Sequence, residues 1–164
     1  FSAWMARRGA RVVAVDLSDE QLATARRCQA AYGPVFPLLL ADAAQVPLPA
    51  GCIDLVVSEH GAAAWCDPEQ WVAEAARVLR PSGRLLVVDF APHDLEFLRD
   101  EHAHRRLGFA PDVVNQWLAA SGLEPVLFQS LPPEPGSDGK IAVSLWLARD
   151  SRALIAAKST REVA

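Results

Sequence analysis

Asp16 is the residue whose type and position point most directly to ligand chemistry. It follows the segment 11–15, which is β-branched and apolar on both faces and therefore predicts a buried strand of a parallel sheet. Ser18 and Gln21 then have the spacing of a capping box, which predicts the start of a helix. A carboxylate at the end of such a strand can accept two hydrogen bonds from the vicinal hydroxyls of a ribose. The structural alternative is an acid that only stabilises the helix dipole.

In nucleotide-binding α/β folds, a glycine-rich turn between strand and helix stands about 20 residues before the ribose-binding acid. Only 15 residues precede Asp16, and they contain no G-x-G motif. Segment 1–8 instead has apolar residues at helical spacing, and Gly9 is a suitable helix C-cap. We therefore expect a cofactor-binding domain without its first strand and glycine loop. We also expect this chain alone to bind the cofactor weakly or not at all.

Two histidines, His102 and His104, raise the question of a metal site. Residues two apart on a helix point about 200° away from each other, so these side chains cannot easily share one metal ion. The three cysteines, Cys28, Cys52 and Cys66, are widely spaced and form neither a C-x-x-C pair nor a disulfide framework. We expect no metal site, and free thiols in a reducing cytoplasm.

Composition limits the possible partners. The 164 residues carry a net charge of −4 and a pI of about 5.5, and 51% of them are apolar. This profile is typical of a globular domain without the basic face that nucleic acid requires. No apolar run approaches the ~18 residues of a membrane span, and no secretory signal is visible. We expect a small-molecule partner, no nucleic acid, no membrane and a cytoplasmic location, and the oligomeric state stays open.

The elements that would position these residues alternate between helix and strand in the first part of the chain. Helices are predicted over 1–8, over 19–32 and from Pro68 onward. Strands are predicted over 11–15, 35–40, 53–58 and 84–90. This alternation is typical of the α/β class with a doubly wound, mainly parallel sheet.

The second part of the chain has a different pattern. Helices are predicted over 94–106 and 111–120, and strands over 123–131 and 140–147. A loop rich in proline and glycine joins the two strands, so we expect them to form a terminal antiparallel pair. We expect one domain over 1–150 and a tail over 151–164.

Four stretches, 12–18, 41–49, 52–59 and 76–85, form a strong signal through their order and spacing. Together they resemble the class I S-adenosylmethionine-dependent methyltransferases, and the resemblance covers 1–150. In that family the first strand lies centrally in the sheet, between the strands predicted here over 11–15 and 53–58. Its loss would leave backbone groups unpaired or force a new pairing.

The resemblance implies S-adenosylmethionine as cofactor and a small-molecule methyl acceptor. It places Asp16 and Leu17 at the ribose. It places Asp42 at the adenine amino group and the Ala43 amide at a ring nitrogen, although Asp42 has an Asx turn as its structural alternative.

The acceptor side is expected at the end of the third predicted strand. The resemblance places Ser58 and Glu59 beside the methyl-transfer site, and we add His60, Trp65 and His102 as acceptor-binding candidates. An aromatic ring or histidine near the cationic sulfonium could act by cation–π contact or by proton removal. For Trp65, core or lid packing is the more common role of such a residue. Catalysis would rest on proximity and alignment, and no dedicated nucleophile is implied.

Three alternatives stay open. Stretches 101–109, 117–124 and 143–150 resemble methyltransferase domains fused behind arsenical-repressor-type regulators, so a non-catalytic ligand-sensing domain is one alternative. A nicotinamide-dependent Rossmann oxidoreductase also uses an acid after its second strand, but the adenine-edge loop and the antiparallel pair count against it. An arsenite methyltransferase would need the cysteine thiols to converge on one site.

Overall fold

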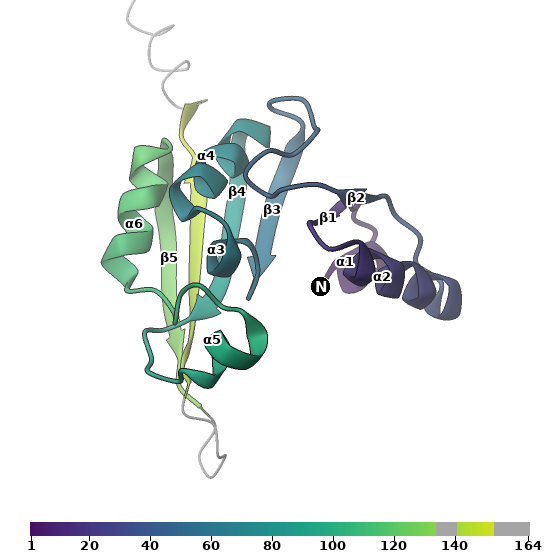
Figure 1. Cartoon of the computed structure of the whole chain (residues 1–164). Coiled ribbons are helices and arrows are strands. Elements are labelled where there is room, and N and C mark those ends of the chain that lie inside the picture. The colour runs from purple at the N-terminus through teal and green to yellow at the C-terminus, as the bar shows by residue number, and fades with distance from the viewer. Residues whose placement is uncertain (134–140, 153–164) are drawn as a thin grey trace, which may run out of the picture. The chain divides into compact units, whose positions relative to one another are not determined.

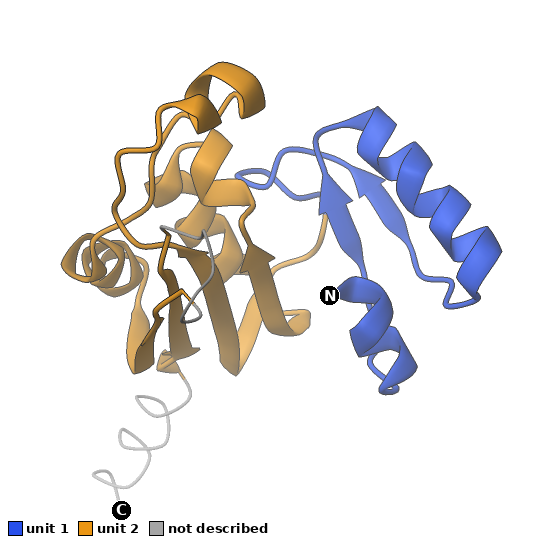
Figure 2. Ribbon diagram, turned by 90° about the horizontal axis from the view of Figure 1, so that it is seen from below, with its two compact units in different colours: residues 1–47 blue, residues 48–164 orange. Residues whose placement is uncertain are grey.

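The computed structural model describes residues 1–133 and 141–152. The chain divides into two compact units, Phe1–Pro47 and Leu48–Ala164, which are coloured separately in Figure 2. Each unit has its own parallel strand pair. Among the described residues, no helix has both the length and the apolar content needed to cross a bilayer.

The first unit contains two helices and two short parallel strands (Figure 1). Its elements are α1 (Ser2–Arg7), β1 (Ala14–Asp16), α2 (Asp19–Tyr32) and β2 (Leu38–Leu40). The predicted helix start is confirmed, because the Ser18 Oγ accepts a hydrogen bond from the Gln21 amide at 3.3 Å. Only this half of the capping box forms, since the Ser18 amide donates to Asp16 Oδ1 and not to the Gln21 side chain. Both strands are shorter than predicted. Pro37 has no amide hydrogen to donate to a ladder, and β2 begins directly after it.

The second unit is a four-stranded mixed sheet with helices packed against it (Figure 1). Its elements are β3 (Ile53–Glu59), α3 (Ala62–Trp65), α4 (Pro68–Val78), β4 (Leu79–Phe90), α5 (Phe97–His102), α6 (Pro111–Ala120), β5 (Leu123–Leu131) and β6 (Val143–Asp150). The strand order is β3-β4-β6-β5, in which β3 and β4 are parallel and the other pairs antiparallel. The predicted antiparallel pair is therefore confirmed.

The core of the second unit lies between this sheet and helices α4 and α6. Alternate residues of β6 are buried, as expected for a strand with one covered face. The largest fully buried side chains come from both layers and include Trp146, Leu79, Leu85 and Leu118. This packing holds the carboxyl ends of β3 and β4 side by side, where the acceptor-side candidates begin.

Several elements differ from the sequence expectation. The α/β class is confirmed, but the strands form two sheets, and no ladder joins β1 to β3 among the described residues. The helix predicted over 94–106 is only α5, because Ala103 adopts a left-handed conformation (φ 54°) and ends it. Helix α3 was not predicted. Most of the loop between β5 and β6 and of the predicted tail over 151–164 lies outside the described residues.

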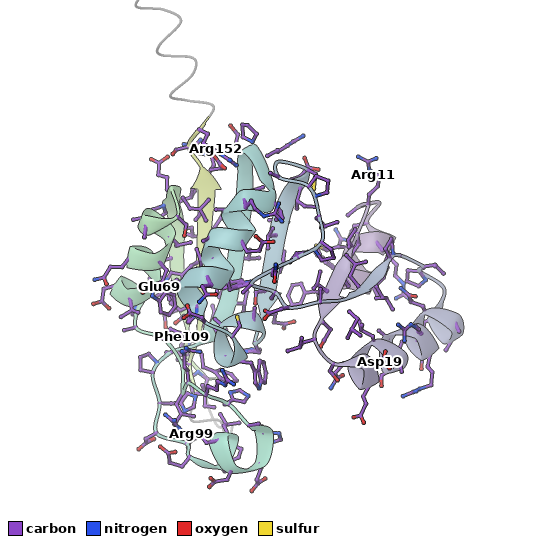
Figure 3. All side chains as sticks on the ribbon, turned by 45° about the horizontal axis from the view of Figure 1, so that its top comes forward. Arg11, Asp19, Glu69, Arg99, Phe109 and Arg152 are labelled. Atoms are coloured by element: carbon purple, nitrogen blue, oxygen red, sulfur yellow. The ribbon has the colours of Figure 1, made fainter. Side chains whose placement is uncertain are left out.

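An ion pair between a buried carboxylate and a half-exposed guanidinium joins the end of β6 to the end of α4. The Asp150 side chain is only 3% exposed and accepts hydrogen bonds from the Arg152 amide (2.8 Å) and from its Nε (2.7 Å). The Arg152 guanidinium also donates to the carbonyl oxygens of Ala76 (3.2 Å) and Leu79 (2.6 Å) (Figure 3). Arg152 therefore neutralises a buried carboxylate and satisfies two carbonyls at a helix end.

We expect Arg152→Ala to lower the free energy of unfolding by about 2 kcal/mol, because it leaves the Asp150 carboxylate buried and unpaired. The half-exposed guanidinium keeps this value below that of a fully buried pair. Arg80→Ala is the control, since Arg80 pairs with Asp54 at the surface and both side chains are well exposed. It should cost less than about 1 kcal/mol. Urea unfolding of both variants measures the difference, and equal losses would contradict this role of Arg152.

Candidate functional site

The first unit brings Asp16 and Asp42 to the same edge of a parallel strand pair. In the β1–β2 register Asp16 is opposite Leu40, and the Ala41 amide donates to the Asp16 carbonyl oxygen at 3.0 Å. Asp42 follows directly. Ligands of open α/β sheets bind outside the carboxyl ends of the strands, which is where both acids lie.

The Asp16 carboxylate is half-buried and partly occupied. Its Oδ1 accepts a hydrogen bond from the Ser18 amide at 2.8 Å, which orients the side chain at the start of α2. Its Oδ2 has no hydrogen-bond partner among the described residues, so it is available to a ligand hydroxyl. Leu17 is 71% exposed and offers an apolar surface beside the carboxylate. The structural and the ligand-binding roles of Asp16 are therefore compatible.

Asp42 forms the Asx turn that was its structural alternative. Its Oδ1 accepts from the Ala44 amide at 2.8 Å, and its backbone carbonyl accepts from the Gln45 amide at 3.0 Å. The side chain is nevertheless exposed, and the Ala43 amide makes no hydrogen bond with the rest of the described chain. The edge thus offers carboxylate oxygens, a backbone donor and an apolar surface, which fit the hydroxyls, ring nitrogens and ring faces of an adenosine.

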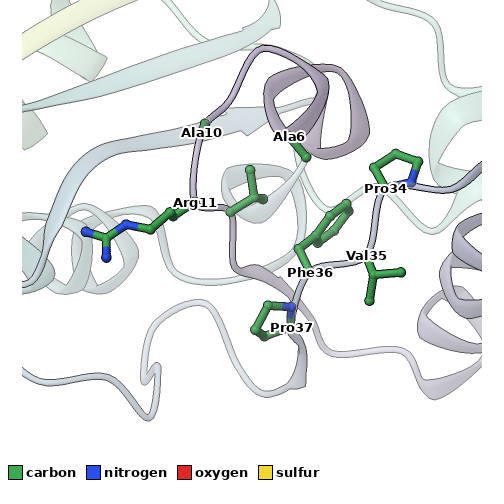
Figure 4. A pocket seen from close by; sticks show the side chains of 8 residues that line it. Ala6, Ala10, Arg11, Pro34, Val35, Phe36 and Pro37 are labelled. Carbon is green, nitrogen blue, oxygen red and sulfur yellow. The ribbon is translucent and has the colours of Figure 1, made fainter.

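A separate hollow of about 350 Å³ lies at the opposite end of the same strands. It is lined by the end of α1 and by the residues just before β1 and β2, including Ala6, Arg11, Val12 and Phe36 (Figure 4). Figure 4 shows the Arg11 side chain extending away from Phe36. Because it lies at the amino ends of the strands, this hollow does not include Asp16 or Asp42.

In the second unit, the acceptor-side candidates lie where β3 ends. Ser58 is half-buried and Glu59 is exposed, and both are paired with β4. His60 follows with a positive φ of 42°, a conformation that is uncommon for a residue other than glycine. Its amide donates to the Val88 carbonyl oxygen at 2.8 Å, so the ladder continues through the turn.

The His60 ring belongs to a group of aromatic side chains that we call the histidine cluster: His60, Trp65, Phe90, His93 and His104. Phe90 is at its centre, with ring centroids 4.2 Å from His60, 5.6 Å from His93 and 6.5 Å from His104. Trp65 meets the His104 ring edge-on at 4.8 Å. The cluster combines residues from the ends of β3 and β4, from α3 and from the segment 91–109.

Backbone contacts hold the segment 91–109 in place over these strand ends. The Phe109 amide donates to the Phe90 carbonyl oxygen at 2.9 Å, and the Arg105 amide donates to that of Ala64 at 3.1 Å. The Arg106 guanidinium donates to the carbonyl oxygens of Ala63 (3.2 Å) and Cys66 (2.6 Å), at the end of α3. The histidines are therefore positioned by a closed loop and not by a free surface segment.

Burial changes the protonation of two of these histidines. Burial lowers the pKa of His104, and repulsion from the neighbouring His102, His93 and His60 in their protonated forms lowers it further. Burial also lowers the pKa of His93, and the nearby charges of Asp94 and Glu96 oppose this only in part. Both imidazoles are therefore neutral at pH 7.

His102 lies elsewhere than the other acceptor-side candidates. Its side chain is exposed at the end of α5, and its ring meets Phe97 at 6.2 Å. Sequence reasoning treated His104 only as a possible metal ligand and did not select Phe90 or His93. The signal for Phe90 was present, because parallel neighbouring strands end at one edge and Phe90 closes the strand beside the one that ends at Glu59.

Asp89, which precedes Phe90, is a buried acid, with 3% of its surface exposed. Its Oδ1 accepts from the Phe90 amide at 2.8 Å, whereas Oδ2 is buried without a partner. Burial raises the pKa of Asp89, although the Phe90 amide and the His60 charge act in the opposite direction. A raised folded-state pKa stabilises the protein at low pH, and this contribution is lost as the pH rises through that pKa.

We therefore expect Asp89→Asn to increase the free energy of unfolding at pH 7 by roughly 1 kcal/mol, because a neutral amide costs less to bury than a carboxylate. The gain should shrink as the pH falls toward about 4, the ordinary pKa of aspartate. Urea unfolding at several pH values measures it. A loss of stability at pH 7 would show that the Asp89 charge is needed in the folded state.

The cysteines of the second unit do not converge. Cys52 precedes β3, and Cys66 follows α3 beyond the other end of that strand, so the seven residues of β3 separate them. Their thiols donate to separate carbonyl oxygens, those of Pro49 and Ala62. Within the described part of the chain, no group of three or more His, Cys, Asp or Glu side chains could hold a metal ion.

Comparison with known proteins identifies the family and the fold of this chain. The sequence model of the family described as "Methyltransferase domain" matches residues 1–87. A demethylmenaquinone methyltransferase of Thermus thermophilus is 42% identical over 84 residues, which is 51% of this chain and 38% of that protein. A malonyl-[acyl-carrier protein] O-methyltransferase of Enterobacter lignolyticus is 39% identical over 120 residues, which is 73% of this chain and 45% of that protein.

Among solved structures, a SAM-dependent methyltransferase of Methanosarcina mazei superimposes with a TM-score of 0.76 at 17% identity, covering 92% of this chain and 86% of that one. The fold is therefore the Rossmann-like fold of class I S-adenosylmethionine-dependent methyltransferases. The chain belongs to the methyltransferase domain family. It spans less than half of the length of the two curated relatives named above.

Proposed function

We propose that this chain provides the cofactor-binding edge and the acceptor side of an enzyme that transfers a methyl group from S-adenosylmethionine to a small-molecule acceptor. The observation that carries the proposal is the position of Asp16 and Asp42 at the carboxyl ends of neighbouring parallel strands. Asp16 at the end of β1 can bind the ribose of an adenosine, and Asp42 after β2 can bind its base. The two relatives named for methyl transfer support the same activity.

The first unit would hold the adenosine. Asp16 accepts hydrogen bonds from the ribose hydroxyls through the oxygen that the Ser18 amide leaves open. The Asp42 carboxylate accepts from the adenine amino group, and the Ala43 amide donates to a ring nitrogen. Leu17 covers an apolar face beside the ribose. When bound, the cofactor would supply an electrophilic methyl group on its sulfonium, and the electron pair of the broken carbon–sulfur bond would stay on sulfur.

The second unit would hold the acceptor. Ser58 and Glu59 end β3 at the carboxyl edge, where the chemistry of α/β enzymes is located. His60 and Trp65 follow, and their rings face the aromatic group centred on Phe90. Methyl transfer needs alignment of two reactants more than a nucleophilic side chain, so proximity is the main contribution of the protein.

The test is isothermal titration of S-adenosylhomocysteine, the demethylated cofactor, into two proteins. One is this chain, and the other is a version extended by a strand and a glycine-rich turn before Phe1. Binding by the extended version, and weak or no binding by the chain alone, is the expected result. If the chain alone binds S-adenosylhomocysteine with micromolar affinity, the expectation of weak binding is wrong, but the assignment of the cofactor is supported.

A nicotinamide dinucleotide is the matched competitor, since it carries the same adenosine. If it binds to either version while S-adenosylhomocysteine binds to neither, the proposed methyl transfer is wrong and an oxidoreductase replaces it. If a small ligand binds and no methyl transfer to any acceptor follows, the ligand-sensing alternative is favoured.

A further inference from the structure

The histidine cluster contains imidazole nitrogens that the protein itself does not use. We propose that it binds the methyl acceptor through an acidic hydroxyl, that of a phenol or an enol, with His60 and His104 as the hydrogen-bond acceptors. This inference rests on the proposed function. It goes further by naming the chemical class of the acceptor and by adding His104 and Phe90 to the site.

The geometry of the rings favours a flat ligand. The His60 ring is tilted by 32° relative to Phe90, and the His104 ring lies within 18° of parallel to it. A planar, unsaturated acceptor can stack beside rings of similar orientation, whereas a flexible aliphatic chain gains little from them. Trp65 adds an edge-on contact to His104 and widens the apolar surface.

Hydrogen-bond accounting separates the three imidazoles. His93 accepts from the Leu95 amide through Nδ1 at 3.2 Å, and its Nε2 is buried without a partner. In His60 only Nδ1 is buried without a partner, and Nε2 makes no hydrogen bond in the described residues. Neither ring nitrogen of His104 makes a hydrogen bond there. His60 and His104 therefore retain nitrogens that a ligand can reach, while His93 has a structural role.

The charge of the cluster favours a hydroxyl over an anion. His93 and His104 are neutral at pH 7, because burial lowers the pKa of each. A neutral imidazole accepts a hydrogen bond from O–H but cannot balance the charge of a carboxylate or phosphate. The nearby cation, Arg106, already donates to the carbonyl oxygens of Ala63 and Cys66. Neither these two imidazoles nor Arg106 therefore offers an unused positive charge to an anionic group.

The reaction balances with these groups. The acceptor oxygen forms a bond to the methyl carbon as the bond between that carbon and sulfur breaks, and the sulfur keeps the electron pair. The hydroxyl proton passes to an imidazole nitrogen of His60 or His104, and the resulting imidazolium returns it to solvent. In an enol acceptor the electron pair of the carbon–carbon double bond attacks instead, and the same imidazole takes the hydroxyl proton.

The test uses 4-cyanophenol, which keeps its hydroxyl proton at pH 7, as the probe and 4-cyanoanisole, its methyl ether, as the matched ligand without a hydroxyl. Imidazole nitrogen resonances of the whole chain are recorded during each titration, without cofactor. We expect 4-cyanophenol to shift the signals of His60 and His104, and to bind about tenfold more tightly than 4-cyanoanisole, which is the value of one net hydrogen bond.

Three variants locate the site. His60→Asn keeps a residue that tolerates positive φ. His60→Asn and His104→Gln should each weaken 4-cyanophenol binding about tenfold. Glu101→Gln, an exposed change in the same segment, is the control and should bind as the unmodified chain does. Amide spectra of each variant show whether it remains folded, and the comparison of the two ligands on the unmodified chain does not depend on any variant.

Equal affinity for the two ligands, or no shift of the His60 and His104 signals, would overturn the inference. If S-adenosylhomocysteine binds and 4-cyanophenol does not, only this inference fails. If 4-cyanophenol binds at the cluster and S-adenosylhomocysteine binds to neither version of the protein, the proposed methyl transfer fails and the ligand class of the cluster stands.

Discussion

Replacing Gly108 by alanine should destabilise the second unit by roughly 3 kcal/mol and displace the histidine cluster. Gly108 has a φ of +80°, and an added Cβ would lie 2.2 Å from the Ala91 carbonyl oxygen and 2.8 Å from that of Phe90. The backbone of the segment 91–109 would have to move away from the end of β4. That movement breaks the hydrogen bond from the Phe109 amide to Phe90 at 2.9 Å.

Gly122→Ala separates the cost of placing alanine at a positive φ from the cost of the steric clash of its Cβ. Gly122 also has a positive φ, +73°, but an added Cβ meets no atom within 4 Å. It should therefore cost only the backbone strain, about 1 kcal/mol. Urea unfolding measures both variants, and the imidazole signals of His93 and His104 report the cluster. Equal losses in the two variants, with unchanged imidazole signals, would show that the approach of Gly108 to β4 is not needed.

Asp16→Ala should weaken S-adenosylhomocysteine binding by about 100-fold, measured in whichever of the two versions of the protein binds it more tightly. The substitution removes charge-assisted hydrogen bonds to two ribose hydroxyls, each worth roughly 1.5–3 kcal/mol. It also removes the acceptor for the Ser18 amide, so the start of α2 should become less stable. Asp16→Asn keeps one acceptor oxygen and should lose less affinity.

Asp19→Asn is the control for charge near the same helix start. Asp19 is exposed in the first turn of α2 and makes a surface ion pair with Arg26 at 3.5 Å. Asp19→Asn changes the net charge as Asp16→Asn does, but the Asp19 side chain is not a proposed ligand of the cofactor. We expect unchanged affinity. If Asp16→Ala and Asp19→Asn have the same small effect, Asp16 is a helix-start acid and not a ribose ligand.

The helices of this chain were largely predictable, because their signals are local. Helix α6 has the predicted bounds, 111–120, with a proline in its first turn and Gly122 just after its end. The capping box at Ser18 likewise placed the start of α2. These signals act through neighbouring backbone groups and do not require knowledge of the tertiary packing.

The strands were predictable in number and order but less so in extent. β4 begins at Leu79, five residues before the predicted start, because Leu79 pairs with Ile53 of β3. β1 and β2 are shorter than predicted, because a strand extends only as far as its partner offers hydrogen bonds. The division into two sheets likewise depends on which strands pair and not on local propensity.

The sequence by itself determined the class of this protein: the alternating elements, the acids that follow two neighbouring strands and the terminal antiparallel pair. These features arise from periodicity and short motifs, which tertiary packing does not alter. Only the tertiary structure decided which side chains form the histidine cluster. His104 joins it and His102 does not, because Ala103 turns left-handed between them and the loop closes on α3 through Arg106. Such contacts join residues that are 14 positions apart (Phe90 and His104) or 40 positions apart (Cys66 and Arg106), and no local pattern encodes them.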